Sequence, residues 1–274
     1  MKAWVNGAVV DESEATVSAF DHGITVGDGV FETAKVVGGV PFALTRHLTR
    51  LAASAYGLGL EAPDNTDLRR AVAETLAANA EHHSGPLRLR ITLTGGTAPL
   101  GSDRGGAGPT LLVAMAPMAP WPPSARLVLV PWTRNEKSAT AGLKTTSYAE
   151  NVVALAHAKA HGGAEAVFAN TAGNLCEGTG SNIFLVLGGE VVTPPLSSGC
   201  LAGVTRALLL EWADVVERDV PVGALLDADE VFLTSSTRDV QAVHAIGDHE
   251  IEPGPVTGLL AAEFARRTAA DVDP

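Results

Sequence analysis

Alternating polar and apolar positions predict strands in the first half of the chain, and wider apolar spacings predict helices. The runs Val30–Val37 (VFETAKVV) and Leu87–Thr94 (LRLRITLT) have the two-residue period of a strand, and Thr110–Ala116 is a short apolar run of the same kind. Apolar residues recur at helical spacing over Leu44–Tyr56 and Leu68–Ala80. The first half therefore predicts a mixed unit of helices and strands.

Short strands dominate the pattern of the second half. Apolar or alternating runs predict strands at Arg126–Val130, Ala164–Ala169, Asn182–Leu187, Glu190–Thr193 and Glu230–Thr234. Helical spacing predicts helices at Ala149–His161, Val204–Val215 and Pro255–Arg267, and Gly162 and Gly163 should end the first of these. We therefore predict a strand-rich second unit.

A proline-rich segment separates the two patterns. The residues Pro117–Ser124 (PMAPWPPS) carry four prolines in eight positions, which neither a helix nor a central strand tolerates. We therefore expect a two-domain α+β (mixed α/β) protein. Its N-terminal α+β domain should cover 1–116, a linker 117–124, and a strand-rich C-terminal domain 125–274.

Composition and charge narrow the possible functions. With 274 residues, 46% hydrophobic and 18% charged, the chain is typical of globular proteins. It has no apolar run of about 18 residues and no signal-like start, so we expect a cytoplasmic protein without a membrane anchor. A net charge of −12 disfavours nucleic-acid binding. Cys176 and Cys200 lie apart from any Cys/His cluster, so we expect reduced thiols and no metal site.

One lysine lies in an unusual local sequence. Lys144 follows Ala141-Gly142-Leu143 and precedes Thr145-Thr146-Ser147, so its neighbours are small and include no carboxylate. An ammonium in such surroundings loses solvation and its pKa falls, which is what a Schiff-base or proton-transferring lysine needs. Lysines are more often simply solvated, so this pattern alone does not establish catalysis.

A carboxylate enclosed by glycines is the second candidate. Glu177 belongs to the run Cys176–Asn182 (CEGTGSN), which leads directly into an apolar strand pattern. Glycine lets the backbone approach a ligand closely, so a carboxylate at this position can contact one. An ordinary glycine-rich turn with an exposed glutamate explains the same pattern.

Three further patterns suggest anion binding. Leu201–Arg206 (LAGVTR) places a glycine and a threonine where a helix should begin, and helix starts bind phosphate, although a plain helix cap is common there. His47 and Arg50 lie among leucines of one predicted helix, and an arginine on an apolar side needs an accompanying anion. Thr234–Thr237 (TSST) places a cluster of hydroxyls after a strand, and an ordinary polar loop explains the same pattern.

The order of these patterns along the chain resembles that of the class IV aminotransferases, the fold type IV enzymes that use pyridoxal phosphate. This family includes branched-chain aminotransferases, D-amino acid aminotransferases and aminodeoxychorismate lyases. The resemblance covers nearly the whole chain. It rests on the segments Phe20–Thr33 (FDHGITVGDGVFET), His47–Leu51 (HLTRL), Leu143-Lys144, Glu177–Phe184 (EGTGSNIF) and Gly203–Arg206 (GVTR).

The resemblance implies a role for each candidate. Lys144 would carry the cofactor as a Schiff base and move protons, and Glu177 would face the pyridine nitrogen and keep it protonated. Leu201 would pack on the ring. The phosphate would be bound by residues from several segments, namely Arg50, Gly203, Val204, Thr205 and Ser236.

Substrate-contacting residues should distinguish the members of the family. Alternation places Phe31, Thr33 and Lys35 on one face of their strand, the expected substrate side. By resemblance, threonine at position 33 favours a lyase, in which its hydroxyl would help to protonate departing pyruvate. Just after the strand that ends at Thr94, where D-amino acid enzymes carry an arginine, this chain has Gly95-Gly96-Thr97, and the Arg-Pro pair of branched-chain enzymes is missing. A cationic substrate site is still possible through Arg88, Arg90 and Arg104. Of these, we take Arg104 as the candidate residue that contacts the substrate.

We therefore expect a lyase that converts 4-amino-4-deoxychorismate to 4-aminobenzoate and pyruvate. The alternative is a class IV aminotransferase that exchanges an amino group with a keto acid, of branched-chain, D-amino acid or R-amine type. A non-catalytic protein that only binds pyridoxal phosphate is disfavoured because both Lys144 and Glu177 are present. The resemblance also implies a homodimer acting on a small amino substrate.

Overall fold

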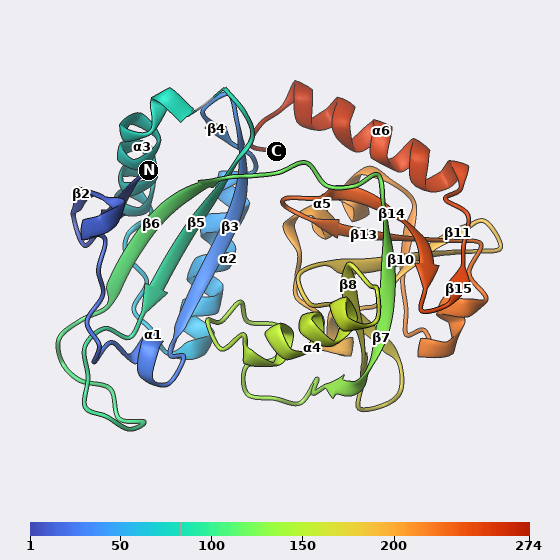
Figure 1. Cartoon of the computed structure of the whole chain (residues 1–274), viewed down its shortest axis with the longest axis horizontal. Helices are drawn as coiled ribbons and strands as arrows, with labels where there is room; N and C mark the ends of the chain where they lie inside the picture. The colour runs from blue at the N-terminus through green and yellow to red at the C-terminus, as the bar shows by residue number, and fades with distance from the viewer. Residues whose placement is uncertain (83) are drawn as a thin grey trace. The chain divides into compact units, whose positions relative to one another are not determined.

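The computed structural model describes residues 1–82 and 84–274 and divides the chain into two compact units. Unit 1 comprises Met1–Ala119, Leu143–Tyr148 and Val272–Pro274, and unit 2 comprises Pro120–Gly142 and Ala149–Asp271. The first passage between the units, at Ala119–Pro120, falls within the proline-rich segment. Figure 1 shows the course of the chain.

Unit 1 is a six-stranded sheet with helices on one face. The strand order is β2-β1-β6-β5-β3-β4, and every pairing is antiparallel. The strands are β1 (Lys2–Val5), β2 (Ala8–Asp11), β3 (Gly29–Val37), β4 (Val40–Pro41), β5 (Leu87–Thr94) and β6 (Thr110–Pro117). The helices are α1 (His22–Thr25), α2 (Leu44–Leu58) and α3 (Asn65–Ala78).

Two helices cover one face of this sheet. Figure 1 shows α2 and α3 behind strands β3, β5 and β6, and the apolar side of α2 packs on β3. Alternate residues of β3 and β5 point into the resulting core, as the two-residue period predicts. These core side chains include Val30, Ala34, Val36, Leu48, Leu51, Leu89, Ile91 and Leu93.

The last residues of the chain complete the start of α2. Ala43, just before the helix, is left-handed (φ 52°) and provides no side-chain cap. The Asp273 carboxylate accepts hydrogen bonds from the Thr45 amide (2.8 Å) and hydroxyl (2.5 Å), while the Val272 carbonyl accepts one from the Ala43 amide (2.7 Å). These contacts satisfy donors that every helix start leaves unpaired.

Unit 2 is built on a nine-stranded mixed sheet. Eight strands run in the order β12-β11-β10-β13-β14-β7-β8-β9, and β15 pairs with β14. The strands are β7 (Ser124–Arg134), β8 (Glu165–Asn170), β9 (Leu175–Gly178), β10 (Asn182–Leu187), β11 (Glu190–Thr193), β12 (Val215–Glu217), β13 (Glu230–Ser235), β14 (Asp239–Ile246) and β15 (His249–Glu250).

Three helices pack on this sheet. α4 (Ala149–Ala160) contacts β7 and β8, α5 (Val204–Trp212) contacts β12 and β13, and α6 (Pro255–Ala270) contacts β13 and β14. The main core contains residues from most strands, among them Leu127, Val167, Ile183, Leu185, Val231, Leu233 and Val243. Short 3-10 helices lie at Glu12–Glu14, Ala80–His82, Leu196–Ser198 and Val222–Leu226.

Each strand and helix expected from periodicity is present, and several have shifted ends. Strand β7, predicted to end at Val130, continues to Arg134, and α5, predicted to reach Val215, ends at Trp212. Ala213 adopts an extended backbone (φ −139°, ψ 162°), and Val215–Glu217 pairs with β11 as the parallel strand β12. Helical spacing alone cannot distinguish a last helical turn from a short buried strand.

The domain prediction differs from the structure in its second half. An uninterrupted domain over 125–274 was expected, whereas Leu143–Tyr148 and Val272–Pro274 belong to unit 1. Both segments hydrogen-bond to unit 1 through backbone groups, which a reading of local pattern does not reveal. Ser124, the last residue of the expected linker, already belongs to β7.

Two properties bear on possible partners. Within residues 1–82 and 84–274, no helix has the length and apolar character needed to cross a bilayer. In the same part of the chain, no three His, Cys, Asp or Glu side chains gather in a way that would hold a metal ion.

Candidate active site

The segment that carries Lys144 pairs with the start of β3 in unit 1. The Phe31 amide donates to the Lys144 carbonyl (2.9 Å), the Thr146 amide donates to the Gly29 carbonyl (2.7 Å), and Val30 forms a bridge with Thr145. Because β4 pairs only with the far end of β3, this half of the edge is open to the segment. The backbone of Lys144 is thereby fixed.

Aromatic rings surround the Lys144 ammonium. Its Nζ lies 4.4 Å from the centroid of the Phe31 ring and 5.8 Å from that of Tyr148, and the two rings meet edge to face. The Arg90 guanidinium lies 3.7 Å from the same Phe31 centroid. The Lys144 amine and the Arg90 guanidinium therefore lie beside the same Phe31 ring.

The face of β3 that carries Phe31 is cationic. Phe31, Thr33 and Lys35 share it as predicted, while the intervening side chains of the strand face the helices. On β5, Arg90 lies opposite Thr33 and Arg88 opposite Lys35. Lys35, Arg88 and Arg90 form what we call the cationic face. In the described part of the chain, no carboxylate pairs with Arg88 or Arg90.

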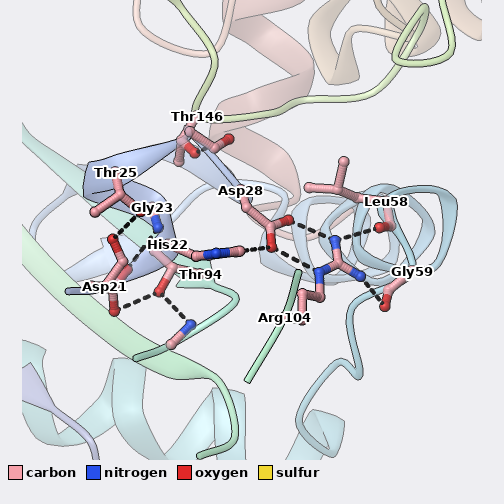
Figure 2. A network of polar contacts seen from close by, with 12 residues as sticks. Asp21, His22, Gly23, Thr25, Asp28, Leu58, Gly59, Thr94, Arg104 and Thr146 are labelled. Carbon is pink, nitrogen blue, oxygen red and sulfur yellow. Dashed lines mark hydrogen bonds and ion pairs between the residues drawn. The ribbon is translucent and has the colours of Figure 1, made fainter. Parts of the chain in front are cut away.

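Arg104 has a different setting from the substrate role predicted for it. Figure 2 shows its guanidinium held between Asp28 and the end of α2. Nε and Nη2 donate to the two Asp28 oxygens (2.7 and 2.6 Å), and Nη1 and Nη2 donate to the Gly59 and Leu58 carbonyls (2.6 and 2.7 Å). Its charge and donors are therefore already matched by the protein, which leaves Arg88 and Arg90 as better candidates for a substrate anion.

The same network holds the strand start that supports Lys144. Asp21 caps α1 by accepting from the Gly23 amide (2.8 Å), and it also accepts from the Thr94 hydroxyl (2.9 Å), as Figure 2 shows. His22 Nδ1 lies 3.2 Å from Asp28 Oδ2. The Gly27 carbonyl accepts from the Thr146 and Ser147 hydroxyls (3.0 and 2.9 Å). Residues 21–29 thus form a rigid support for the lysine segment.

Arg50 is bound by a buried carboxylate, which answers the sequence argument that it needs an anion. Its Nε and Nη2 donate to the two Glu32 oxygens, each at 2.7 Å, and His47 Nδ1 lies 2.6 Å from Glu32 Oε2. Burial alone would raise the pKa of Glu32, but Arg50 and His47 outweigh it and lower that pKa to about 2. Glu32 therefore fixes the orientation of the guanidinium.

In unit 2, Glu177 lies near the end of strand β9, just before a loop that is held by hydrogen bonds. Its Oε2 accepts from the Leu201 amide (2.9 Å), so two predicted cofactor residues are directly joined. The loop after it is held by Glu165, whose Oε1 accepts from the Thr179 amide (3.1 Å). Arg134 approaches Glu177 from β7, with Nε 3.4 Å from Oε1. The glutamate is therefore positioned by the protein and is not an exposed turn residue.

The start of α5 is the helix start at which the sequence predicts phosphate binding. Gly203 precedes the helix in an extended conformation, and Val204 and Thr205 are buried in its first turn. A Cβ at position 203 would lie 1.9 Å from Asn182 Oδ1, so only glycine fits. Asn182 in turn donates to the Leu201 carbonyl (2.8 Å). Ser236 is half-buried in the turn between β13 and β14.

Each unit by itself carries groups that suit pyridoxal phosphate. Unit 1 supplies an amine beside aromatic rings and an oriented arginine. Unit 2 supplies a fixed carboxylate and a helix start whose glycine lies against Asn182. Lys144 and Arg50 thus belong to unit 1, whereas Glu177, Leu201, Val204, Thr205 and Ser236 belong to unit 2.

Comparisons with known proteins agree with this chemistry. The family model described as Amino-transferase class IV matches residues 29–246. A putative branched-chain-amino-acid aminotransferase of Methanocaldococcus jannaschii is 34% identical, covering 96% of this chain and 95% of its own. An aminodeoxychorismate lyase of Bacillus subtilis is 30% identical, covering 86% and 84%.

A solved structure extends the likeness to the fold and the cofactor. The PLP-bound form of a hypothetical aminotransferase from Mycobacterium tuberculosis is 25% identical, with a TM-score of 0.89, covering 99% of this chain and 100% of its own. The fold type and the cofactor expected from the sequence are confirmed. The chain belongs to the class IV aminotransferase family and is a pyridoxal phosphate enzyme of fold type IV.

Proposed function

We propose that this enzyme is an aminotransferase that exchanges an amino group between an amino acid and a keto acid. The observation that carries the proposal is the cationic face beside the Lys144 amine within unit 1. An enzyme that acts on amino acids and keto acids needs two kinds of group. It needs an amine that moves a proton at the amino-bearing carbon, and it needs cations that bind the substrate carboxylate. The aminotransferases among the relatives also support this choice over the lyase predicted from the sequence.

Each residue has a definite task in this proposal. Bound pyridoxal phosphate supplies an electron sink for the pair released when a bond at the substrate's amino-bearing carbon breaks. Lys144 attaches the cofactor and, once freed, removes the proton from that carbon and delivers it elsewhere. Glu177 keeps a proton on the ring nitrogen, while Arg50 and the start of α5 hold the phosphate and Leu201 packs on the ring. Arg90 and Arg88 bind the substrate carboxylate.

The acceptor requirement tests this function. With an amino acid alone, the purified enzyme should convert its cofactor once to the amino form and stop, and adding a keto acid should restart turnover. The absorbance of the cofactor measures its conversion to the amino form. Amino acid analysis measures the turnover that follows when the keto acid is added. Continuous turnover of an amino substrate without any keto acid would contradict the proposal.

The lyase is a second candidate, supported by the Thr33 hydroxyl on the face of β3 beside Lys144. Its side chain is half-buried on the face of β3 that also carries Phe31 and Lys35, so its hydroxyl could protonate departing pyruvate. Steady release of 4-aminobenzoate and pyruvate from aminodeoxychorismate, without a keto acid, would establish the lyase. Thr33→Val should then reduce turnover by about tenfold or more, since a proton donor is lost. In a transaminase the same change should alter donor preference only.

Removing Arg90 should weaken binding of acidic substrates. We expect Arg90→Leu to raise KM for amino and keto acids about tenfold to a hundredfold, because a charge-assisted hydrogen bond contributes about 1.5–3 kcal/mol. Steady-state kinetics measures this effect. A primary amine without a carboxylate is the matched substrate, and its kcat/KM should not fall. Arg70→Leu, on the exposed side of α3, is the control variant. An equal loss for acid and amine would remove Arg90 from substrate recognition.

A further inference from the structure

Arg134 ends strand β7 beside the carboxylate that is proposed to face the cofactor. Its guanidinium is mostly buried, with 17% of the side chain exposed, and it has three polar neighbours. One terminal nitrogen pairs with Glu150, Nη2 donates to Asn151 Oδ1 (2.9 Å), and Nε lies 3.4 Å from Glu177 Oε1. The guanidinium carbon also lies 4.3 Å from the centroid of the buried Phe168 ring. The arginine is thus fixed from several sides.

The contact with Glu177 is electrostatic and is not a hydrogen bond. Nε is buried and has no hydrogen-bond partner among the residues that the structure describes, although a carboxylate oxygen lies within ion-pair distance. A guanidinium at this distance stabilises the negative charge of the carboxylate without using Nε–H to occupy one of its lone pairs. An oxygen that also has to accept from a ring nitrogen benefits from such an arrangement.

Apart from Arg134 and the Leu201 amide that donates to Oε2, the described surroundings of Glu177 are buried and disfavour a charged carboxylate. Its side chain is 13% exposed, and the Cys176, Leu175 and Phe168 side chains nearby are fully buried. Burial raises the pKa of the Cys200 thiol to about 11, and the negative charge of Glu177 adds to this effect. The pKa of Cys176 is raised for the same two reasons. A carboxyl group in this environment would tend to become neutral unless a cation offsets the loss of solvation.

We infer that Arg134 is a positioning residue that keeps Glu177 ionised, so that Glu177 can hold the proton on the cofactor's ring nitrogen. This inference rests on the role proposed for Glu177. Asn151 links the two, because its amide nitrogen donates to the Thr179 carbonyl (2.6 Å) while its oxygen accepts from Arg134. Arg134 therefore fixes the loop after Glu177 as well as the charge on Glu177.

The charged and titratable groups around Glu177 define the controls. Arg134 approaches from β7, the Cys176 and Cys200 thiols flank it, and Glu150 on α4 is the second carboxylate of Arg134. On the far side of Gly178, Glu165 forms a closed buried pair with Arg238 (2.6 Å). Arg134 is the cation whose ion pair with Glu177 the structure gives, which makes it the residue to vary.

Titration of the glutamate itself tests the inference. The full-length protein, with and without pyridoxal phosphate, is labelled with carbon-13 at glutamate side-chain carboxyls, and the Glu177 signal is identified by its absence from Glu177→Gln. In the wild type, Glu177 should stay ionised down to about pH 5 or below, near or under the ordinary glutamate range. A Glu177 carboxyl that is protonated at neutral pH in the cofactor-free wild type would overturn the inference, whether or not any variant folds.

Variants separate charge from structure. Arg134→Gln should raise the titration midpoint of Glu177 by about one pH unit or more, a tenfold rise in proton affinity, because the offsetting charge is lost. Arg134→Lys should restore most of this shift, whereas Glu150→Gln should not raise the midpoint. Equal midpoints in the wild type and Arg134→Gln would refute the role.

The outcome for the proposed function is independent of this titration. If Glu177→Gln exchanged amino groups at the wild-type rate, the role of Glu177 in the proposed function would fail, while the carbon-13 midpoints would still decide whether Arg134 sets its charge. The cofactor absorbance spectrum gives a second readout in the loaded enzyme. Arg134→Gln should shift its pH dependence in the direction of the Glu177→Gln spectrum, and an unchanged profile would contradict the link to the ring nitrogen.

Discussion

Lys144→Ala should abolish turnover while leaving the fold intact. We expect a loss of kcat of about 10⁴-fold or more, because the change removes both the covalent attachment of the cofactor and the group that moves the proton. The fold should survive because Lys144 joins unit 1 through its backbone, and an alanine keeps those hydrogen bonds. Steady-state rates with an amino acid and a keto acid measure the loss.

A matched variant shows whether the loss is specific. Lys159→Ala removes an exposed lysine from the last turn of α4 and should keep wild-type turnover. Circular dichroism and thermal unfolding should be nearly the same for both variants. Proton transfer by a positioned side chain alone contributes about 100-fold or more to the rate. Lys144→Ala activity above about one per cent of the wild type would therefore contradict a central role for Lys144.

Glu32→Gln should cause the largest loss of stability among the substitutions considered. Glu32 is 1% exposed and bonds both Arg50 and His47, so an amide there leaves the half-buried Arg50 without its counter-charge. Breaking a buried ion pair from one side costs about 3–5 kcal/mol. Urea denaturation should show this decrease in the free energy of unfolding. A loss within the range of a surface pair, below about 1 kcal/mol, would show that Arg50 is held by other groups.

Glu263→Gln is the matched control for that experiment. Hydrogen bonds from Arg266 and Arg267 lower the pKa of Glu263 to about 2, the same value as for Glu32, but Glu263 lies on the exposed side of α6. Solvent and salt screen this pair, so its removal should affect stability far less than removal of the buried one. The comparison isolates burial as the cause.

The pH dependence of stability has a definite sign for Glu32. Its pKa in the folded protein, about 2, lies below the ordinary value of 4.5, so the stabilisation is fully present above about pH 5. It is lost as the pH falls from the ordinary value through the folded value. Glu32→Gln should therefore have a shallower decline in stability between about pH 5 and pH 2 than the wild type.

Local pattern predicted the fold elements that have a strong period and missed those that depend on turns or edges. The strands over 30–37 and 87–94 were predicted from alternation and are present in β3 and β5. The hairpin of β1 and β2 was missed, although Asn6-Gly7 adopts positive φ values (45° and 105°), and Asn-Gly is the strongest short hairpin signal. Strand β14 was missed despite its alternating sequence.

The candidate site was predictable as a set of residue types but not as a set of contacts. Lys144 stood out because its neighbours are small, but the β3 edge and the Phe31 and Tyr148 rings beside it come from distant parts of the chain. Asp28 and Glu32 lie within the quoted run 20–33, yet their partners Arg104 and Arg50 are identified only by the fold. The homodimer implied by the resemblance and the cytoplasmic location inferred from the sequence stay predictions.

The central claim is that the cofactor is carried by Lys144, and covalent labelling tests it most directly. Borohydride reduces the bond between pyridoxal phosphate and a lysine to a stable secondary amine, and peptide mass spectrometry then locates the added mass. Of the five lysines, Lys35 is the closest rival, because it shares the face of β3 with Phe31. We expect the label on the peptide that contains Lys144 in the wild type, and no label on the corresponding peptide of Lys144→Ala. Label on Lys35, or on the surface lysines Lys137 or Lys159, would contradict the assignment.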